Sequence, residues 1–182
     1  MKVLILGATG LVGRNALAQA LAHPAVTQVI APTRKPLTKQ DKLMNPVAPK
    51  LELLLPDVTE WALDAAICAT GTTIKKAGSK EAFRSVDHDL PLSFARLAHQ
   101  AGTQNFALVS AIGASVDSSF FYARVKGELC LQAEANRSRC TFCNTARPDE
   151  FREQIDGLRH KPRHKIERSG QSARKLLKVW WS

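Results

Sequence analysis

The sequence predicts an α/β fold in which one domain is built on a doubly wound parallel sheet. Short apolar runs alternate with helical patterns along most of the 182 residues, and such alternation produces right-handed crossovers between parallel strands. A glycine-rich turn separates the first apolar run from the first helical pattern. The apolar fraction of 45% is enough for one continuous core in a chain of this length. Together these observations indicate a Rossmann-type sheet.

The first half of the chain supplies four predicted strands and one helix. Lys2–Leu6 is an apolar run that ends at a glycine, which is typical of a strand buried on both faces. A helical pattern follows over Leu11–Leu21, and His23-Pro24 ends it because proline disfavours helical backbone in the residue before it. The segment 35–50 is rich in Pro and Lys and predicts a surface loop or a broken helix. The further strands predicted here are Val26–Ala31, Leu51–Leu54 and Ala65–Ala69.

The second half continues the alternation. A helical region is predicted from Ser79 to Gly102, with an interruption or a new start near Asp89-Leu90-Pro91. The remaining predicted elements are a strand at Phe106–Val109, a helix at Phe120–Ala135 and a strand at Cys140–Cys143. We expect residues 1–148 to form the dinucleotide-binding domain and residues 149–182 to form a divergent, irregular, basic tail.

Charge and composition limit the environment of the protein. The formal net charge is +10, but residues 1–134 hold 14 Lys and Arg against 11 Asp and Glu, so most of the excess lies in residues 135–182, which hold 12 Lys and Arg against 5 Asp and Glu. The tail is expected to be solvated rather than bound to nucleic acid, because its basic stretch from Arg159 onward lacks aromatic residues until Trp180 and Trp181. No apolar run approaches the roughly 20 residues of a membrane helix. Four cysteines without a secretory signal lead us to expect a cytoplasmic protein.

The glycine-rich turn is the strongest functional signal. Three glycines at spacing i, i+3, i+6 lie between a buried strand and a helix, where they permit a tight turn and close approach of a pyrophosphate. The positive end of the helix then faces the phosphates. The predicted cofactor-binding residues of this turn are Gly7, Ala8, Thr9, Gly10, Leu11, Val12 and Gly13.

Basic residues near the end of the second strand favour NADP(H) over NAD(H). An acidic residue there would bind the ribose hydroxyls of NAD, whereas a cation pairs with the 2′-phosphate of NADP. The chain has Arg34 and Lys35 at this point, and Arg14 directly after the third glycine adds another cation. The alternative is that these are ordinary solvated surface cations. Asp57, after the predicted third strand, is a candidate for the adenine edge or a plain loop aspartate.

A serine, a tyrosine and a lysine supply the predicted chemistry. Tyr122 is the only tyrosine, and Lys126 lies four residues later on the same helical face. A lysine cation lowers the pKa of a neighbouring phenol from about 10, which allows proton transfer to or from a carbonyl or alcohol oxygen. Ser110 ends a strand and is the candidate that orients the substrate oxygen. Ser115, Ser118 and Ser119 compete for that role.

With these residues the sequence resembles the short-chain dehydrogenase/reductases, in particular a small atypical branch of bacterial NAD(P)-binding oxidoreductase-like proteins. The resemblance covers about residues 1–134 and implies a Rossmann fold that transfers hydride between NAD(P) and a carbonyl or alcohol. It implies catalytic roles for Ser110, Tyr122 and Lys126, and a cofactor-lining role for Ala69, Thr70 and Gly71. The segments that carry it are Gly7–Gly13, Cys68–Thr73, Val86–Pro91, Val109–Ala114 and Phe121–Glu128.

After Glu134 the chain departs from the family pattern. Ala146-Arg147-Pro148 survives, but a short basic stretch follows where the family has a longer part that builds the substrate pocket. Either the tail has diverged or a reading-frame slip has replaced the native end. Cys140, Cys143, His160 and His164 resemble a zinc pattern, but the spacing is longer than usual and two of them fall in a predicted strand. We therefore expect no metal.

Two functional hypotheses remain at this point. The first is an NADP(H)-dependent oxidoreductase for a small carbonyl or alcohol substrate. A homodimer is compatible with this hypothesis, and no membrane partner is expected. The second is a non-catalytic cofactor sensor that changes partners with its NADP(H) occupancy. The intact serine, tyrosine and lysine favour the first, and the altered C-terminal region favours the second. A nonfunctional product is a third alternative.

Overall fold

A six-stranded parallel sheet in the order β3-β2-β1-β4-β5-β6 forms the centre of the computed structural model, which describes residues 1–103, 105–135 and 139–143. The strand order reverses between β1 and β4, so successive strands are added outward on both sides of this pair. Ligands of open α/β sheets bind at such a switch point, outside the carboxyl ends of the strands. The predicted fold class is confirmed. The strands are β1 Lys2–Leu6, β2 Gln28–Ile30, β3 Leu43–Met44, β4 Ala65–Cys68, β5 Asn105–Val109 and β6 Arg139–Cys143.

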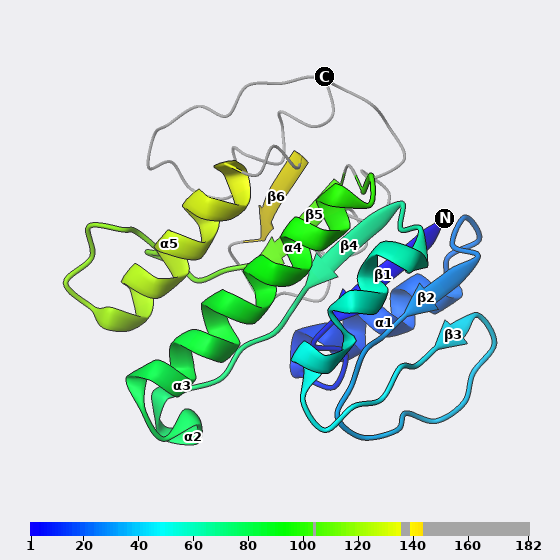
Figure 1. The fold of residues 1–182 in the computed structure, drawn as a ribbon, viewed down its shortest axis with the longest axis horizontal. Helices are drawn as coiled ribbons and strands as arrows, with labels where there is room; N and C mark the ends of the chain where they lie inside the picture. Colours follow the sequence, from blue (N-terminus) through cyan, green and yellow to red (C-terminus); the bar gives the residue numbers. More distant parts are fainter. Residues whose placement is uncertain (104, 136–138, 144–182) are drawn as a thin grey trace.

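Helices cover both faces of the sheet (Figure 1). On one face α1 (Leu11–Ala22) packs over Val3 and Ile5, and on the other α4 (Leu90–Gln100) packs over Leu4 and Leu6. This division follows from the strand period, because successive side chains of β1 point to opposite faces. The helix α5 (Phe121–Ala135) lies beside α4, as does the 3₁₀ helix η2 (Pro56–Trp61). Two apolar layers therefore hold the carboxyl ends of the strands in fixed positions.

The connection from β4 to α4 is a chain of short helical segments. The first two are α2 (Ile74–Ala77) and α3 (Lys80–Arg84), which begin where Thr73 Oγ1 accepts from the Lys76 amide at 3.2 Å and Ser79 Oγ accepts from the Ala82 amide at 3.1 Å. A π-helical turn, η3 (Ser85–Asp89), then joins α3 to α4. The predicted interruption near residues 89–91 is confirmed in this form. Turns of this kind occur frequently at functional sites.

One strand prediction was wrong. Residues 51–54 form a 3₁₀ helix, η1 (Leu51–Leu54), and the third strand is β3, inside the segment predicted as a loop or broken helix. Only two residues of β3 pair with β2, and the positive φ of 63° at Lys42 turns the chain into this edge strand. A two-residue strand is too short to show an apolar period. Asp57 consequently lies in η2 and does not follow a strand.

The other predicted elements agree with the structure to within one or two residues, and the helix predicted from Phe120 begins at Phe121. Within the described ranges, no helix is long and apolar enough to cross a membrane. The predicted boundary at residue 148 and the tail 149–182 lie outside the described residues.

Candidate functional site

The glycine turn between β1 and α1 lies at the switch point of the sheet. Gly7 has φ of 87°, and a Cβ added there would lie 2.6 Å from the Ala69 carbonyl atoms, which follow β4. A Cβ on Gly13 would overlap the backbone carbonyl of Gly7. Both glycines are thus required by the packing of the turn against neighbouring backbone.

Gly10 is different, because the fold itself does not require a glycine there. Its φ of −75° suits any residue, and a Cβ added to it would meet the Gly7 carbonyl oxygen only at 3.4 Å, with the next nearest atom at 4.0 Å. Gly10 is also exposed to solvent. A glycine at this position leaves room for a group outside the chain to approach the backbone, as a pyrophosphate does in a dinucleotide site.

The start of α1 is open to an anion. Gly10 is its N-cap and offers no side-chain acceptor, and the first turn contains no acidic residue. The unpaired amides of this turn and the helix dipole favour a phosphate. Arg14 follows directly, and the residues present therefore fit the diphosphate of a dinucleotide.

A pocket of about 340 Å³ adjoins the turn on the outer side of α1. Arg14 and Thr9 lie at the glycine turn, and Thr38 and Gln40 close the pocket from the loop after β2. No carboxylate lines it. The complete lining is Ala8, Thr9, Arg14, Leu17, Ala18, Leu21, Leu37, Thr38 and Gln40.

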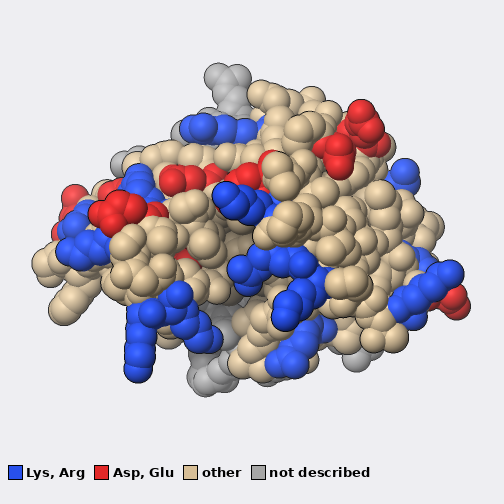
Figure 2. All heavy atoms as spheres, turned by 60° about the horizontal axis from the view of Figure 1, so that its bottom comes forward, with Lys and Arg blue, Asp and Glu red and all other residues tan. Residues whose placement is uncertain are grey.

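Arg34 and Lys35 extend this basic region from the end of β2. Both side chains are exposed, whereas the preceding Thr33 is buried and fixes the backbone by donating from Oγ1 to the Lys35 carbonyl at 2.7 Å. Asn45 donates to the same hydroxyl at 2.8 Å. Figure 2 shows Lys and Arg atoms gathered over the middle and lower part of this face, with the acidic atoms placed mainly toward its upper and outer parts.

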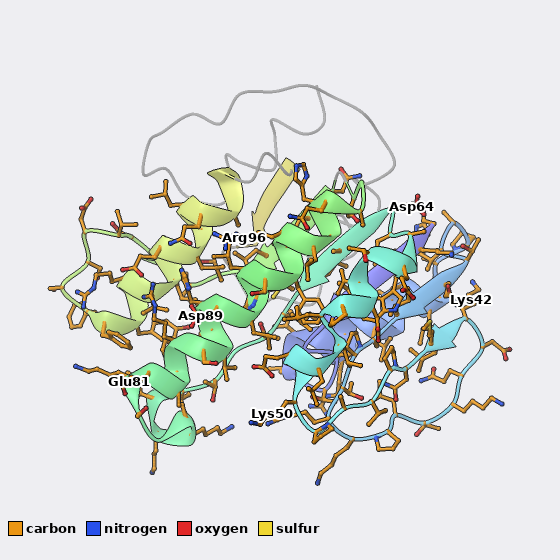
Figure 3. The ribbon with its side chains drawn as sticks, viewed as in Figure 1. Lys42, Lys50, Asp64, Glu81, Asp89 and Arg96 are labelled. Atoms are coloured by element: carbon orange, nitrogen blue, oxygen red, sulfur yellow. The ribbon has the colours of Figure 1, made fainter. Side chains whose placement is uncertain are left out.

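The loop after β4 forms the opposite wall of the site. Ala69 donates its amide to the Leu6 carbonyl at 2.8 Å, which ties this loop to the end of β1. Cys68 is fully buried, and its burial raises the pKa of the thiol, while the Thr70 hydroxyl lies 3.2 Å from its sulfur. Of the three residues that the family resemblance assigns to the cofactor, Ala69 and Thr70 therefore border the glycine turn directly, whereas Gly71 lies beside Asp87. In Figure 3, Asp64 marks the opposite end of β4 from this loop.

Lys126 forms a buried ion pair that the sequence did not predict. Its Nζ lies 2.7 Å from Asp87 Oδ1, and the two side chains are only 4% and 1% exposed. The other oxygen, Asp87 Oδ2, accepts from the Thr72 amide at 2.8 Å. One carboxylate of the π-helical turn thus connects the loop after β4 to α5. The ammonium of Lys126 is held at the carboxyl edge of the sheet, where a cofactor would bind.

Tyr122 lies one turn before Lys126 on α5. Its side chain is 42% exposed, and its ring centroid lies 5.6 Å from that of Phe83, which is completely buried in α3. This contact packs the ring on one aromatic neighbour, while the residue remains partly exposed to solvent. Ser110 follows β5, and its hydroxyl oxygen lies 3.1 Å from the sulfur of Cys130 on α5. In the described part of the chain, no hydrogen bond joins Ser110, Tyr122 and Lys126 to one another.

Two of the competing serines have structural roles in the loop between β5 and α5. Ser115 accepts from the Asp117 amide at 3.2 Å, and Ser118 accepts from the Phe120 amide at the same distance. These bonds hold turns, whereas Ser110 lies at the end of the strand and contacts α5. Its placement keeps Ser110 as the preferred candidate.

Sequence reasoning missed Asp87 and Cys130 as members of this region. Asp87 stands in a segment that carries the family resemblance, Val86–Pro91, but a carboxylate in a helical pattern gives no sign of being buried. Cys130 lies four residues after Lys126 and eight after Tyr122. This spacing, which keeps residues on one helical face, was the signal available for it.

The zinc pattern lies largely outside the described structure. The backbone of Cys140 and Cys143 forms part of β6, as the predicted strand requires, but their side chains and both histidines are not described. Among the residues with described side chains, no group of three or more His, Cys, Asp or Glu is arranged to hold a metal ion.

Comparison with known proteins identifies relatives but no matching family model. The chain is 38% identical over 136 residues to the protein fmp52, mitochondrial, of Emericella nidulans, covering 70% of this chain and 58% of that protein. It is 34% identical over 138 residues to the protein FMP52, mitochondrial, of Candida albicans, covering 71% and 58%. The chain thus spans less than two thirds of the length of these curated relatives.

Solved structures of similar fold include proteins in complex with NAD. The Bordetella bronchiseptica enzyme WbmH, in complex with NAD+, has a TM-score of 0.65 at 13% identity, covering 79% of this chain and 55% of that one. The oxidoreductase ylbE from Lactococcus lactis has a TM-score of 0.59 at 19% identity, covering 78% and 66%. At these identities the similarity establishes the fold alone, which is a Rossmann-type doubly wound sheet.

The comparisons correct one prediction. The cytoplasmic location expected from the cysteine content and the first residues is contradicted by the relatives, which are named as mitochondrial proteins. Reduced cysteines and an apolar first strand are properties of the folded domain, and they do not distinguish between cellular compartments.

Proposed function

We propose that the chain is an NADP(H)-preferring oxidoreductase of the short-chain dehydrogenase/reductase type that acts on a small carbonyl or alcohol. The observation that carries this proposal is the buried Lys126–Asp87 pair at 2.7 Å, at the carboxyl edge of the sheet. Burying an ion pair costs more than burying apolar side chains of similar volume. A buried lysine at this edge of the sheet therefore supports a use of its charge there.

The residues of this site divide the chemistry among them. When bound, the cofactor supplies or accepts the hydride. Tyr122 donates the phenol proton to the oxygen of a carbonyl, or takes a proton from an alcohol in the reverse direction. Lys126 has three donor hydrogens, of which one faces Asp87 and others remain for a ribose hydroxyl. Ser110 orients the substrate oxygen by donating its hydroxyl hydrogen.

The preference for NADP(H) rests on charge near the glycine turn. Arg14 lines the pocket beside the glycine turn, and Arg34 and Lys35 follow β2, whose end lies near the ribose 2′-position of a dinucleotide in this fold. The pocket beside Arg14 has no carboxylate in its lining, and an acidic residue is what would select the free ribose hydroxyls of NAD. We expect NADPH to bind more tightly than NADH, as measured by fluorescence titration of either nucleotide.

The direct test of catalysis is Tyr122→Phe, which removes one oxygen atom and keeps the ring that packs on Phe83. NADPH oxidation is followed spectroscopically with a panel of aldehydes and ketones. We expect the variant to lose turnover by about 100-fold or more, since general acid–base catalysis contributes on that order. Its NADPH affinity and unfolding midpoint should match the wild type. A variant that keeps full turnover would contradict the role of Tyr122.

A non-catalytic NADP(H)-binding protein is the second candidate function. It is favoured by the lack of any hydrogen bond among Ser110, Tyr122 and Lys126 within the described residues. The carbonyl panel distinguishes the candidates, because a sensor would bind NADPH and turn over none of the compounds.

A further inference from the structure

The face of α5 that carries Tyr122 and Lys126 also carries Cys130. The three residues follow one another at intervals of four, so they form a line along one side of the helix. Cys130 is half-buried and packs against the core between α4 and the sheet. Its sulfur lies 3.1 Å from Ser110 Oγ. The hydroxyl proposed to orient the substrate oxygen is thus in contact with a thiol from the helix that carries the proposed acid.

Only one of these two groups can donate the hydrogen between them. A hydroxyl and a thiol each have one hydrogen and free lone pairs. If Ser110 donates to the sulfur, its hydrogen is no longer directed at a substrate. If Cys130 donates to Oγ, the Ser110 hydrogen remains available for a carbonyl oxygen, and the two hydrogen bonds reinforce each other.

We propose that Cys130 is a positioning residue whose thiol donates to Ser110 Oγ and thereby directs the Ser110 hydroxyl toward the substrate oxygen. This inference rests on the proposed function. It also distinguishes two cysteines of the chain, because Cys68 is 1% exposed and contacts Thr70, whereas Cys130 contacts the proposed reactive edge of the sheet.

The first test compares two variants. Cys130→Ala removes the hydrogen-bond donor at this position, and Cys130→Ser keeps one. For NADPH-dependent carbonyl reduction we expect Cys130→Ala to lower kcat by about three- to tenfold, the effect of one neutral hydrogen bond. Cys130→Ser should restore kcat to within about twofold of wild type by the same hydrogen bond. The KM for NADPH should stay constant in both. Equal losses in the two variants would overturn the proposal, because they would show that side-chain volume alone matters.

The second test needs no turnover. The rate of iodoacetamide alkylation of Cys130 is measured by peptide mass spectrometry in wild type, Ser110→Ala and the control Ser119→Ala, which removes an exposed hydroxyl of the adjoining loop. Loss of the Ser110 contact should change the rate severalfold, whereas the control should match wild type. An unchanged rate in Ser110→Ala would overturn the pairing even if the enzyme is active. If alkylation shows the pairing but no carbonyl is reduced by wild type, the proposed function and the positioning role fall, and only the contact stands.

Discussion

At the scale of single residues, the site depends on one buried carboxylate. Asp87 pairs with Lys126 through one oxygen and with the Thr72 amide through the other. It therefore determines the position of both a side chain of α5 and a backbone segment after β4. A surface ion pair would contribute little, but a pair in which both side chains are at most 4% exposed is strongly coupled.

The coupling can be measured with Asp87→Asn, Lys126→Met and the double variant. Each single change leaves the remaining group buried without its partner, and we expect each to lower the free energy of unfolding by about 3 kcal/mol. The double variant should lose clearly less than the sum of the two, because it leaves no unpaired charge. Urea unfolding measures all three. Strictly additive losses would show that the two groups do not interact.

The glycines of the turn provide a second prediction at this scale. Gly13→Ala places a Cβ against the Gly7 carbonyl, whereas Gly10→Ala meets no protein atom closer than 3.4 Å. We expect Gly13→Ala to destabilise the fold by about 1–3 kcal/mol, as overpacking does. Gly10→Ala should leave the unfolding midpoint near wild type and weaken NADPH binding at least tenfold. Unchanged affinity in Gly10→Ala would contradict a pyrophosphate at the turn.

At the scale of elements, α3 is held at its start by Ser79 and Glu81. Ser79 Oγ accepts from the Ala82 amide, and hydrogen bonds from its own backbone amide and from Ser79 hold the pKa of Glu81 below its usual value. Figure 3 shows Glu81 at the beginning of the helical run that continues past Asp89 to Arg96. Because α3 carries Phe83, on which Tyr122 packs, this cap supports the position of the proposed acid.

The cap predicts a pH-dependent effect of Ser79→Ala. A carboxyl with a lowered folded-state pKa adds stability above its unfolded pKa, and this contribution is lost as the pH falls through the folded pKa. At pH 7 we expect the variant to lose about 1 kcal/mol of unfolding free energy. The difference from wild type should narrow as the pH falls from 6 toward 3. Thr73→Ala is the matched control, because it removes the cap of α2, which has no acidic residue in its first turn, so its loss should not vary with pH.

Several of the elements that agree with their predictions have a clear apolar signal. β1, α1, β4 and β5 are strongly patterned, and the glycine turn marks where β1 ends. The third strand was missed because β3 has two residues and is paired at the edge through the Lys42 turn. Leu51–Leu54 was predicted as a strand because a short run of leucines is equally compatible with a strand and with a 3₁₀ helix. In the structure it is a 3₁₀ helix with Leu54 buried.

The site was predictable to the extent that it depends on local spacing. The glycine turn and the Tyr122–Lys126 interval are properties of one segment each, so they can be recognised along the chain. The Asp87–Lys126 pair and the Ser110–Cys130 contact join residues 39 and 20 positions apart. They arise from the packing of η3 and β5 against α5, which no local pattern specifies.

At the scale of the whole molecule, the parallel sheet brings separate segments to one edge. The glycine turn, the end of β2 and the loop after β4 all lie at the carboxyl ends of adjacent strands. Arg14, Arg34 and Lys35 are exposed cations of these segments. The positive end of the α1 dipole and these positively charged side chains therefore both attract the phosphates of a nucleotide at this edge.

This arrangement predicts how cofactor binding should respond to salt. NADPH carries one phosphate more than NADH, and exposed charge pairs weaken as the Debye length falls from about 10 Å at 0.1 M to about 3 Å at 1 M salt. We expect the Kd for NADPH to rise more steeply with salt than the Kd for NADH. Arg34→Ala should weaken NADPH about fivefold, in line with one exposed ion pair, and reduce its salt dependence, while leaving NADH unchanged.

Arg96→Ala is the matched control for this experiment, because Arg96 is an exposed arginine on α4 and stands outside the basic face formed at the glycine turn and the end of β2. Its removal lowers the net charge by the same amount as Arg34→Ala, so any effect of total charge appears equally in both. A specific 2′-phosphate contact should separate them, with NADPH affinity reduced only in Arg34→Ala. Equal salt slopes for NADPH and NADH in the wild type would show that the basic face attracts the shared diphosphate alone and does not select between the two cofactors.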